Sequence, residues 1–210
     1  MDEKQILVLA PHIDDGEWGC GASIYKWVLS GHKVHYVAFS AAEESVPKDL
    51  SPDILRNEIL TAAETLSIPL SQLHVLQFRV RYFPRDRQDI LEEMIRIRSE
   101  IDPDIVVLPS SYDTHQDHAV INQEGFRAFK RSTILGYEIP WNNRQIDLTY
   151  FNGVNKICID KKIEALSAYK SQLFRASNYA DLVTSLGIQR GSQVGLEYAE
   201  AFEVIRLVDR

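Results

Sequence analysis

The sequence predicts an α/β fold of three layers, in which helices cover both faces of a mostly parallel sheet. Apolar runs of strand length alternate along the chain with segments of helical periodicity, a pattern typical of this class. Of the 210 residues, 45% are hydrophobic and 10% are aromatic, which is enough for a large core. The length lies within the range of one α/β domain, so we expect a single domain over residues 1–210.

The first strand and helix are the clearest elements. Ile6–Ala10 is an uninterrupted aliphatic run, typical of a strand buried on both faces. Gly19–Leu29 carries apolar side chains on one face at helical spacing, and Gly31 is a typical signal for a helix end. Lys33–Ser40 is then predicted to form the second strand.

The following segments continue the alternation. Ser51 and Pro52 are expected to be the N-cap and the first residue of a helix that ends near Leu66. After it we expect a strand over Leu73–Phe78, a helix over Arg87–Ile101 and a strand over Asp104–Pro109. Strands separated by helices predict parallel pairing, because each helix returns the chain to the starting edge of the sheet.

Beyond residue 109 the pattern is more mixed. A helix is expected over Asp117–Lys130, followed by β-rich segments at Thr133–Ile139 and Gly153–Ile159. Lys161–Leu173 has helical spacing. Ala199–Val208 alternates between apolar and polar residues, as a half-buried antiparallel strand does.

Charge and cysteine content exclude several classes of function. The net charge is −7, and the basic residues form no long run, which argues against a nucleic-acid partner. Cys20 and Cys158 are the only cysteines, so the chain has no disulfide framework and no Cys-x-x-Cys metal motif. The start lacks the basic and apolar regions of a signal peptide, and no apolar run approaches the ~20 residues that span a bilayer. We expect a cytoplasmic protein with no membrane partner; the sequence leaves a homo-oligomer open.

Two polar clusters follow strands of the predicted sheet. "PHIDDGEWG" begins at Pro11, after the first strand, and "PSSYDTHQDH" begins at Pro109, after the fourth. In open α/β sheets ligands bind beyond the carboxyl ends of the strands, and strands one and four can flank the point where the strand order reverses. These loops would then bring six side chains together: His12, Asp14, Asp15, His115, Asp117 and His118.

These residue types suit a hydrolytic zinc site. Such a site uses three nitrogen or carboxylate ligands and leaves a position for water; a histidine and a carboxylate of the first loop and a histidine of the second would supply them. Asp14 and Asp15 are adjacent and point in different directions, so one can hold the metal while the other faces the water. Taken singly, either aspartate is more simply explained as a helix N-cap, and either histidine of the second loop as a helix-start residue. Two His/Asp clusters in a chain with six histidines favour the metal site.

A dinucleotide site is a competing interpretation of the first loop. Gly16, Gly19 and Gly21 are spaced GxxGxG, whereas the dinucleotide fingerprint is GxGxxG. The second strand also ends in Ser40 and not in the acid that binds a ribose. Both departures argue against a nucleotide cofactor.

The two clusters also carry a resemblance. "APHIDDGEWGCGA", followed about 100 residues later by "THQDH", resembles the PIG-L/LmbE-like family of zinc-dependent N-deacetylases. Leu55–Leu66 and Lys161–Gln172 resemble two further helices of that family, so the resemblance covers most of the chain. It implies a Rossmann-like, LmbE-like fold and removal of the N-acetyl group from a GlcNAc-type amino sugar, whether free, glycosidic or nucleotide-linked. Ile13 and Gln116 stand where proline is usual in the family, and neither position supplies a ligand.

The resemblance also implies roles for the site residues. The three zinc ligands would be His12, Asp15 and His118. Fe²⁺ is an alternative ion for the same ligands in cells. Asp14 becomes the general base that takes a proton from the attacking water, and His115 polarises the carbonyl or acts as an acid. Asp117 would hold His115 in orientation.

Substrate-binding candidates are Arg56, Arg81 and Tyr112. Arg56 lies in the segment that resembles the family's Arg-x-x-Glu helix, although a salt bridge to Glu58 would explain it equally well. Arg81 belongs to the basic segment Arg79–Arg87, whose guanidinium groups could bind a nucleotide diphosphate or an acidic sugar. A solvated loop is the alternative for that segment. Tyr112 is the candidate for a tyrosine that assists the oxyanion in some members of the family.

Two other functions remain as alternatives. The first is a metal-dependent hydrolase of a phosphoester or of another amide; a two-metal phosphoesterase would need a second set of bridging carboxylates, and only the first loop is rich in acids. The second is a non-catalytic member of the family, which would lack the water-activating acid, whereas Asp14 is present. "TILGYEIPWNN" and "YAEAF" resemble stretches of a bacterial subgroup linked to surface-polysaccharide sugars, which suggests polysaccharide biosynthesis as the setting.

Overall fold

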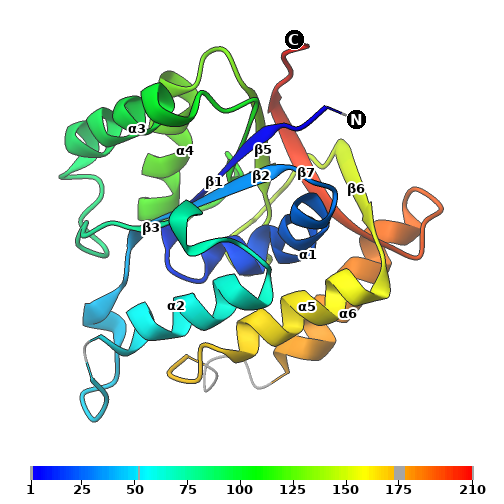
Figure 1. Ribbon diagram of the computed structural model, residues 1–210, viewed down its shortest axis with the longest axis horizontal. Coiled ribbons are helices and arrows are strands. Elements are labelled where there is room, and N and C mark those ends of the chain that lie inside the picture. Colours follow the sequence, from blue (N-terminus) through cyan, green and yellow to red (C-terminus); the bar gives the residue numbers. More distant parts are fainter. Residues whose placement is uncertain (1, 52, 173–177, 210) are drawn as a thin grey trace.

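A seven-stranded sheet forms the centre of the computed structural model, which describes residues 2–51, 53–172 and 178–209 (Figure 1). Its strands, in spatial order, are β3 (Leu73–Val75), β2 (Lys33–Ser40), β1 (Gln5–His12), β4 (Ile105–Pro109), β5 (Thr133–Tyr137), β7 (Tyr198–Arg206) and β6 (Tyr150–Val154). The first five pair in parallel, whereas β7 is antiparallel to both β5 and β6. The predicted α/β class with a mostly parallel sheet is confirmed.

Helices form a layer on each face of the sheet. They are α1 (Asp15–Leu29), α2 (Ile54–Thr65), α3 (Arg87–Ile101), α4 (Gln116–Ala128), α5 (Lys156–Ser167) and α6 (Tyr179–Ser192), with short 3₁₀ helices η1 (Glu43–Ser45) and η2 (Leu70–Gln72) in the connections. α3 and α4 pack together on one face, whereas α1, α2, α5 and α6 form the other layer (Figure 1). Among the described residues, no helix combines the length and the apolar character that crossing a membrane requires.

β1 lies at the centre of the sheet and contributes to both cores. Ile6, Val8 and Ala10 belong to the core under α1, α2 and α5. Leu7 and Leu9 point to the opposite face and belong to the core under α3 and α4. All five side chains are at most 1% exposed. Burial on both faces therefore explains why this strand is an uninterrupted aliphatic run.

The connection between β6 and α5 differs from the expectation. The strand expected over Gly153–Ile159 ends at Val154, because the side chain of Asn155 accepts a hydrogen bond from the Cys158 N–H (3.0 Å) and caps a helix. α5 thus begins and ends earlier than the expected helix Lys161–Leu173, whose last residue lies outside the described part of the chain. α6 is not among the elements that the sequence predicts.

Smaller differences occur in the first half of the chain. α1 begins at Asp15, earlier than expected, and so starts directly after the first polar loop. Asp53, and not Ser51, occupies the N-cap position of α2, while Pro52 lies outside the described residues. β3 ends before Leu76, so the third strand is shorter than expected.

α1 consists of two helical pieces joined at Cys20, whose φ of −150° is not helical. The N–H groups of Ala22 and Ser23 donate to the carboxylate of Glu200 on β7, at 3.3 and 2.6 Å. Lys162 of α5 pairs with the same carboxylate at 2.6 Å, and both side chains are buried. Because N–H groups at the start of a helix lack partners within it, this buried ion pair acts as the N-cap of the second piece.

We expect Glu200→Ala to lower the free energy of unfolding by about 3–5 kcal/mol. The variant leaves the Lys162 ammonium buried without a counter-charge and two backbone N–H groups without their acceptor. Urea denaturation followed by circular dichroism measures the change. Glu197→Ala, which removes an exposed acid nearby in the sequence, is the control and should change stability by less than about 0.5 kcal/mol. Equal stability of both variants would contradict the capping role.

Candidate metal centre

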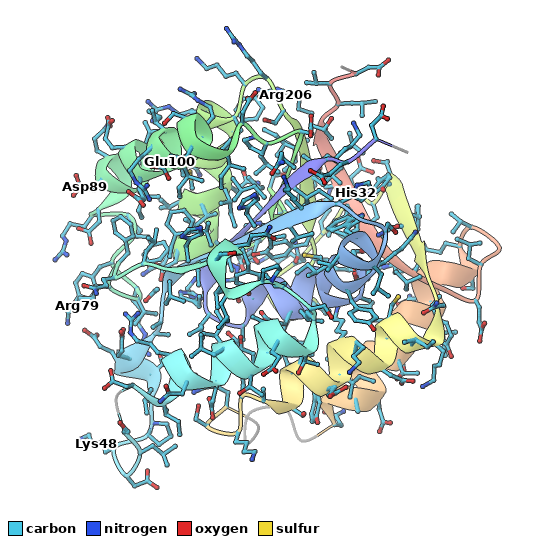
Figure 2. The ribbon with its side chains drawn as sticks, viewed as in Figure 1. His32, Lys48, Arg79, Asp89, Glu100 and Arg206 are labelled. Atoms are coloured by element: carbon cyan, nitrogen blue, oxygen red, sulfur yellow. The ribbon has the colours of Figure 1, made fainter. Side chains whose placement is uncertain are left out.

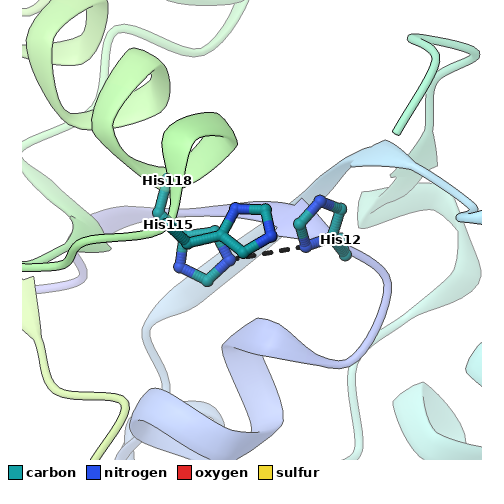
Figure 3. Close-up of side chains that lie close together, drawn as sticks. All are labelled: His12, His115 and His118. Atoms are coloured by element: carbon teal, nitrogen blue, oxygen red, sulfur yellow. Dashed lines mark hydrogen bonds between the residues drawn. The ribbon is translucent and has the colours of Figure 1, made fainter. Parts of the chain in front are cut away.

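The two predicted polar clusters meet at the carboxyl edge of the sheet, where β1 and β4 are neighbours. His12 is the last residue of β1, and Asp15 is the first of α1. His115 is the N-cap of α4, and His118 lies in the first turn of that helix. Figure 3 shows the three imidazole rings together, with His12 approaching from the strand and the other two from the helix; their centroids are 4.6–5.2 Å apart. The loops after the first and fourth strands therefore meet, which the predicted fold allowed.

Three donor atoms form a compact triangle. His12 Nδ1 and His118 Nε2 lie 3.0 and 3.1 Å from Asp15 Oδ2, and 3.4 Å from each other. Ligands held about 2.0–2.1 Å from a tetrahedral zinc ion are roughly 3.3 Å apart, so this spacing fits one cation. Two imidazole nitrogens and one carboxylate also form a donor set of the kind that zinc uses in hydrolytic sites.

In each of the two histidines, the ring nitrogen that faces away from Asp15 contacts another carboxylate. His12 Nε2 lies 3.0 Å from Asp117 Oδ2, and His118 Nδ1 lies 2.7 Å from Asp113 Oδ2. In each neutral ring the proton belongs on the nitrogen that faces its carboxylate, so the nitrogen that faces Asp15 keeps its lone pair. Both imidazoles are therefore oriented as metal ligands would be.

The second loop contains one contact that the sequence does not reveal and one that differs from the expectation. Asp113 is not among the predicted site residues, because nothing but its acidic character in the second cluster marks it. The carboxylate of Asp117 contacts His12 and accepts the Arg81 N–H at 2.6 Å. Among the hydrogen bonds of the described residues, none joins this carboxylate to His115; Asp117 instead contacts that ring through its backbone N–H, which donates to His115 Nδ1 at 3.2 Å. The spacing of the acids could not show which ring each would face.

The charges of this cluster favour a cation between the three donors. Burial alone would lower the pKa of His12, but the carboxylates of Asp15 and Asp117 outweigh it and raise that pKa to about 9. Burial would also lower the pKa of His118, but Asp15 and Asp113 raise it to about 10. Burial would raise the pKa of Asp15, yet the two imidazoles hold it well below its ordinary value. The carboxylates thus stabilise a positive charge between the three donors. A bound metal ion can carry that charge in place of protons on the two imidazole rings.

His115 lies beside the triangle in a different environment. One of its nitrogens lies within 4.8 Å of those of His12 and His118, so His115 is the alternative to Asp15 as third ligand. Its Nδ1 accepts the Asp117 N–H, which leaves the proton of the neutral ring on Nε2. Burial, together with the charges of His118 and His12, lowers the pKa of His115. A neutral ring with an Nε2–H suits a hydrogen-bond donor to a carbonyl better than a metal ligand.

Asp14 faces the same cavity without belonging to the triangle. It occupies the N-cap position of α1, where its carbonyl accepts the Trp18 N–H (3.1 Å) but its side chain makes no capping hydrogen bond. Asp14 lines the cavity, while the neighbouring Asp15 side chain turns toward the two imidazoles. The N-cap interpretation therefore accounts for the backbone of Asp14 and not for the place of its carboxylate.

A buried acid, Glu17, lies beneath the loop that carries Asp14. The hydroxyls of Tyr36 and Tyr169 both hydrogen-bond its carboxyl, Tyr169 at 2.8 Å. The Ile13 carbonyl oxygen lies close to the same hydroxyls, 3.2 Å from that of Tyr36 and 2.9 Å from that of Tyr169, and competes with Glu17 for their protons. The sequence does not distinguish Glu17 from a surface acid, because its burial depends on two tyrosines from distant segments.

We expect Glu17→Gln to remove a pH-dependent part of the stability. Burial raises the pKa of Glu17 from 4.5 to about 7, against the hydrogen bonds from the two tyrosines. Because the folded state holds this proton more tightly, the contribution is fully present below about pH 4.5 and is lost as the pH rises to about 7. The parent should lose on the order of 3 kcal/mol more than the variant between about pH 5 and pH 8, measured by urea denaturation. Glu64→Gln, at an exposed position, should behave like the parent, and the same pH dependence in all three proteins would contradict the assignment.

A cavity of about 410 Å³ opens onto the triangle. Its apolar lining consists of Ile13, Trp18, Ala42, Leu55, Val80, Trp141 and Leu166. Of the three substrate-binding candidates, Arg81 lines the cavity, whereas Arg56 and Tyr112 do not. Arg56 instead pairs with Glu43 at 2.8 Å, a different acid from the Glu58 that the sequence offered.

Three arginines of the basic segment 79–87 are paired with acids. The pairs are Arg79–Glu44 (2.5 Å), Arg85–Asp86 (2.6 Å) and Arg87–Glu124 (2.5 Å). Figure 2 shows Arg79 at the periphery of the molecule. The solvated-loop alternative therefore accounts for these three residues but not for Arg81.

Arg81 is held at the cavity by its backbone. Its φ of +72° is left-handed, a conformation that costs a non-glycine residue roughly 1–2 kcal/mol. The Arg81 N–H donates to Asp117 and its carbonyl accepts from the side chain of Gln116, each at 2.6 Å. The guanidinium contacts the Ser45 hydroxyl at 3.3 Å. Two hydrogen bonds to the start of α4 thus maintain a strained backbone, as is common where a protein places a functional side chain.

Comparison with known proteins gives a family and a fold. Residues 7–129 match the model of the PIG-L family, described as GlcNAc-PI de-N-acetylase. The chain is 27% identical over 174 residues to a protein of Escherichia coli named uncharacterized deacetylase YaiS, a match that covers 80% of this chain and 91% of the relative.

Two solved structures are similar in fold. The N,N'-diacetylchitobiose deacetylase of Pyrococcus horikoshii has a TM-score of 0.82 at 21% identity, covering 97% of this chain and 84% of that one. GalB, the 4-carboxy-2-hydroxymuconate hydratase of Pseudomonas putida, has a TM-score of 0.79 at 21% identity, covering 99% of both chains. Because an enzyme named as a hydratase shares the fold, the fold by itself does not identify the reaction.

Proposed function

The chain belongs to the PIG-L family, and we propose that it is a metal-dependent N-deacetylase that removes the N-acetyl group from an N-acetylated amino sugar. One observation carries this proposal. Three donor atoms lie 3.0–3.4 Å from one another at a cavity that Asp14 and His115 also line. This arrangement combines a cation site, an acid and a hydrogen-bond donor within reach of one substrate.

The residues at the triangle fit a zinc ion, with Fe²⁺ as the alternative. His12, Asp15 and His118 would hold the ion, and the carboxylates of Asp117 and Asp113 would keep the two imidazoles in orientation. When bound, such an ion supplies Lewis-acid chemistry toward water and toward a carbonyl oxygen.

The remaining steps belong to side chains of the chain. Asp14 takes a proton from the water that attacks the acetamide carbon, and His115 donates its Nε2–H to the carbonyl oxygen as negative charge develops there. The C–N bond then breaks, and Asp14 returns the proton to the leaving nitrogen. The acetic acid that forms loses its remaining proton to the released amine or to water, so acetate and the free amino sugar are the products.

Arg81 is the substrate-binding residue that the geometry favours. Its guanidinium lies at the cavity and, among the contacts of the described residues, its hydrogen bond to Ser45 leaves donors available for an anionic group of the substrate. Arg56 and Tyr112 would reach a substrate only if it extended beyond the cavity lining. An acidic or phosphorylated sugar derivative is therefore within the proposed substrate range.

A hydrolase of phosphoesters or of another amide is the second candidate. Among the described residues, the side chains placed to hold a metal ion form one cluster, in which His12 and His118 are joined by Asp15 or by His115; a single cluster favours one metal over the two of many phosphoesterases. Metal analysis of the purified protein distinguishes the two, because the deacetylase requires about one ion per chain.

The experiment that tests the proposal is an assay of acetate release. Free, glycosidic and nucleotide-linked N-acetyl amino sugars are offered to the metal-loaded protein, with and without a chelator. We expect acetate from at least one class, loss of the activity with the chelator and its return with added Zn²⁺ or Fe²⁺. If the metal-loaded protein releases acetate from none of them, the proposal is wrong and another amide or ester is the substrate.

A further inference from the structure

Two tryptophans form an aromatic wall of the cavity that the proposed chemistry does not use. Trp18 and Trp141 both line the cavity, and their rings meet edge to face, with centroids 4.9 Å apart and planes at 87°. Trp141 is 57% exposed. Large aromatic side chains at the mouth of a cavity, exposed to solvent, commonly mark a binding surface.

The two rings differ in their burial and in the segment that carries them. Trp18 follows Asp15 by three residues in the first piece of α1, so both side chains project from the same side of the helix. Trp18 is half-buried, whereas Trp141, which contacts it from the loop after β5, is exposed and so lies nearer to solvent. An acetamido group at the triangle would therefore have its own ring near Trp18 and the group attached to that ring near Trp141.

The turn that carries Trp141 is already ordered. The Asn142 N–H donates to the Ile139 carbonyl (2.9 Å), and the Ile139 N–H donates to the side chain of Asn143 (3.0 Å). Thr114 donates to the carbonyl of Asn142 through its N–H (3.1 Å) and its hydroxyl (2.8 Å). Because the ring sits on a turn tied to the second polar loop, little conformational entropy is lost when a ligand stacks on it.

The polar groups near this wall indicate a sugar. The side chains of Asn142 and Gln172 lie in the same lining, and amides are suitable partners for hydroxyl groups. A pyranose ring has an apolar C–H face, which an electron-rich aromatic face attracts, and a rim of hydroxyls. Asn142 Nδ2 donates to Asp113 at 3.4 Å and Gln172 Nε2 to Ser171 at 3.2 Å, and an acyl chain would offer neither amide a further hydrogen bond. A diphosphate-linked nucleoside is disfavoured, because the cavity lining holds Asp14 and Asp15 but a single arginine.

We propose that Trp141, backed by Trp18, is the stacking surface for a second pyranose ring, so that the protein prefers an acetamido sugar within a glycoside over the free monosaccharide. This inference rests on the proposed deacetylase function and names its substrate class. Trp141 is in this view a specificity-determining residue that contacts the ring next to the reacting sugar.

Kinetics on three substrates test the proposal: N-acetylglucosamine, N,N'-diacetylchitobiose and UDP-N-acetylglucosamine. For Trp141→Ala we expect kcat/KM on the disaccharide to fall about tenfold, mainly through a higher KM, with less than a twofold change on the monosaccharide. Trp141→Phe should restore most of the lost activity. Phe126→Ala, which removes another exposed aromatic ring on α4, is the control and should match the parent on all substrates.

Three outcomes would overturn the stacking surface. The first is an unchanged kcat/KM on the disaccharide, and the second is an equal loss of kcat/KM on monosaccharide and disaccharide. The third is a loss confined to the UDP-linked substrate, which would show that the two tryptophans bind the uracil base and not a second sugar ring.

A binding measurement separates this proposal from the proposed function. Chitobiose with free amino groups is titrated into the parent and into Trp141→Ala, and tryptophan fluorescence is followed. Saturable quenching that weakens about tenfold in the variant supports the subsite even if no acetamide is hydrolysed, in which case only the deacetylase assignment fails. No saturable change in the parent would overturn the subsite even if acetate is released.

Discussion

Replacement of Asp14 by alanine is expected to lower kcat by about 10²–10⁴-fold while the metal content stays near that of the parent. Asp14 lines the cavity, whereas the neighbouring Asp15 turns its carboxylate toward His12 and His118. The variant therefore removes the acid that moves the proton and leaves the three donor atoms in place. Acetate release and metal analysis on the same preparation measure both parts of the expectation.

The control for this prediction is Asp89→Asn. Asp89 is an exposed acid of α3 that Figure 2 shows on the outside of the molecule, and its loss should leave both activity and metal content unchanged. Asp14→Asn extends the test, because the amide keeps the size of the side chain but cannot accept the proton. A metal-replete Asp14→Ala protein with the turnover of the parent would exclude Asp14 as the base.

His118→Ala is the second change with a large expected effect: it should reduce the bound metal from about one ion per chain to a small fraction of that, and activity with it. His118 Nε2 is one of three donors, and two donors do not hold zinc against dialysis as three do. Asp113→Asn should give a graded version, a 10–100-fold loss of metal affinity, because the ring would lose the carboxylate that orients it. Metal analysis after dialysis and competition with a chelator measure both effects.

The same measurement decides between the two candidates for the third ligand. Asp15→Ala should lose the ion, and His115→Ala should keep it while losing turnover, because the neutral His115 ring carries its proton on Nε2. His74→Ala, at an exposed histidine outside the site, is the control. A His115→Ala protein without metal beside an Asp15→Ala protein with metal would assign the site to the three histidines instead.

Much of the fold was predictable because its signals are local. The uninterrupted aliphatic run Ile6–Ala10 could only be satisfied by burial on both faces, and the alternation of strands and helices implied a parallel sheet. One of the errors occurs where a single side chain decides between two structures. The run after Gly153 has the composition of a strand, but Asn155 caps a helix there, so the strand ends at Val154.

For the candidate site, the residues that meet were predictable, but their individual contacts were not. Loops after the first and fourth strands meet because β1 and β4 are neighbours, and this brings His12 to His118 across 106 positions of sequence. The partner of each ring was not predictable. Asp117 faces His12 and Asp113 faces His118, because the direction of a side chain in a loop depends on the path of that loop through space.

The sequence by itself determined the class of fold, the two clusters of chemistry-bearing residues and their place at the carboxyl edge of the sheet, because periodicity and strand ends are properties of short segments. Only the tertiary structure decided which nitrogens face the triangle, that Glu17 is buried under two tyrosines and that Trp141 stands against Trp18. Each of these depends on contacts between residues far apart in the chain, and the packing of the whole domain sets their distances and burial.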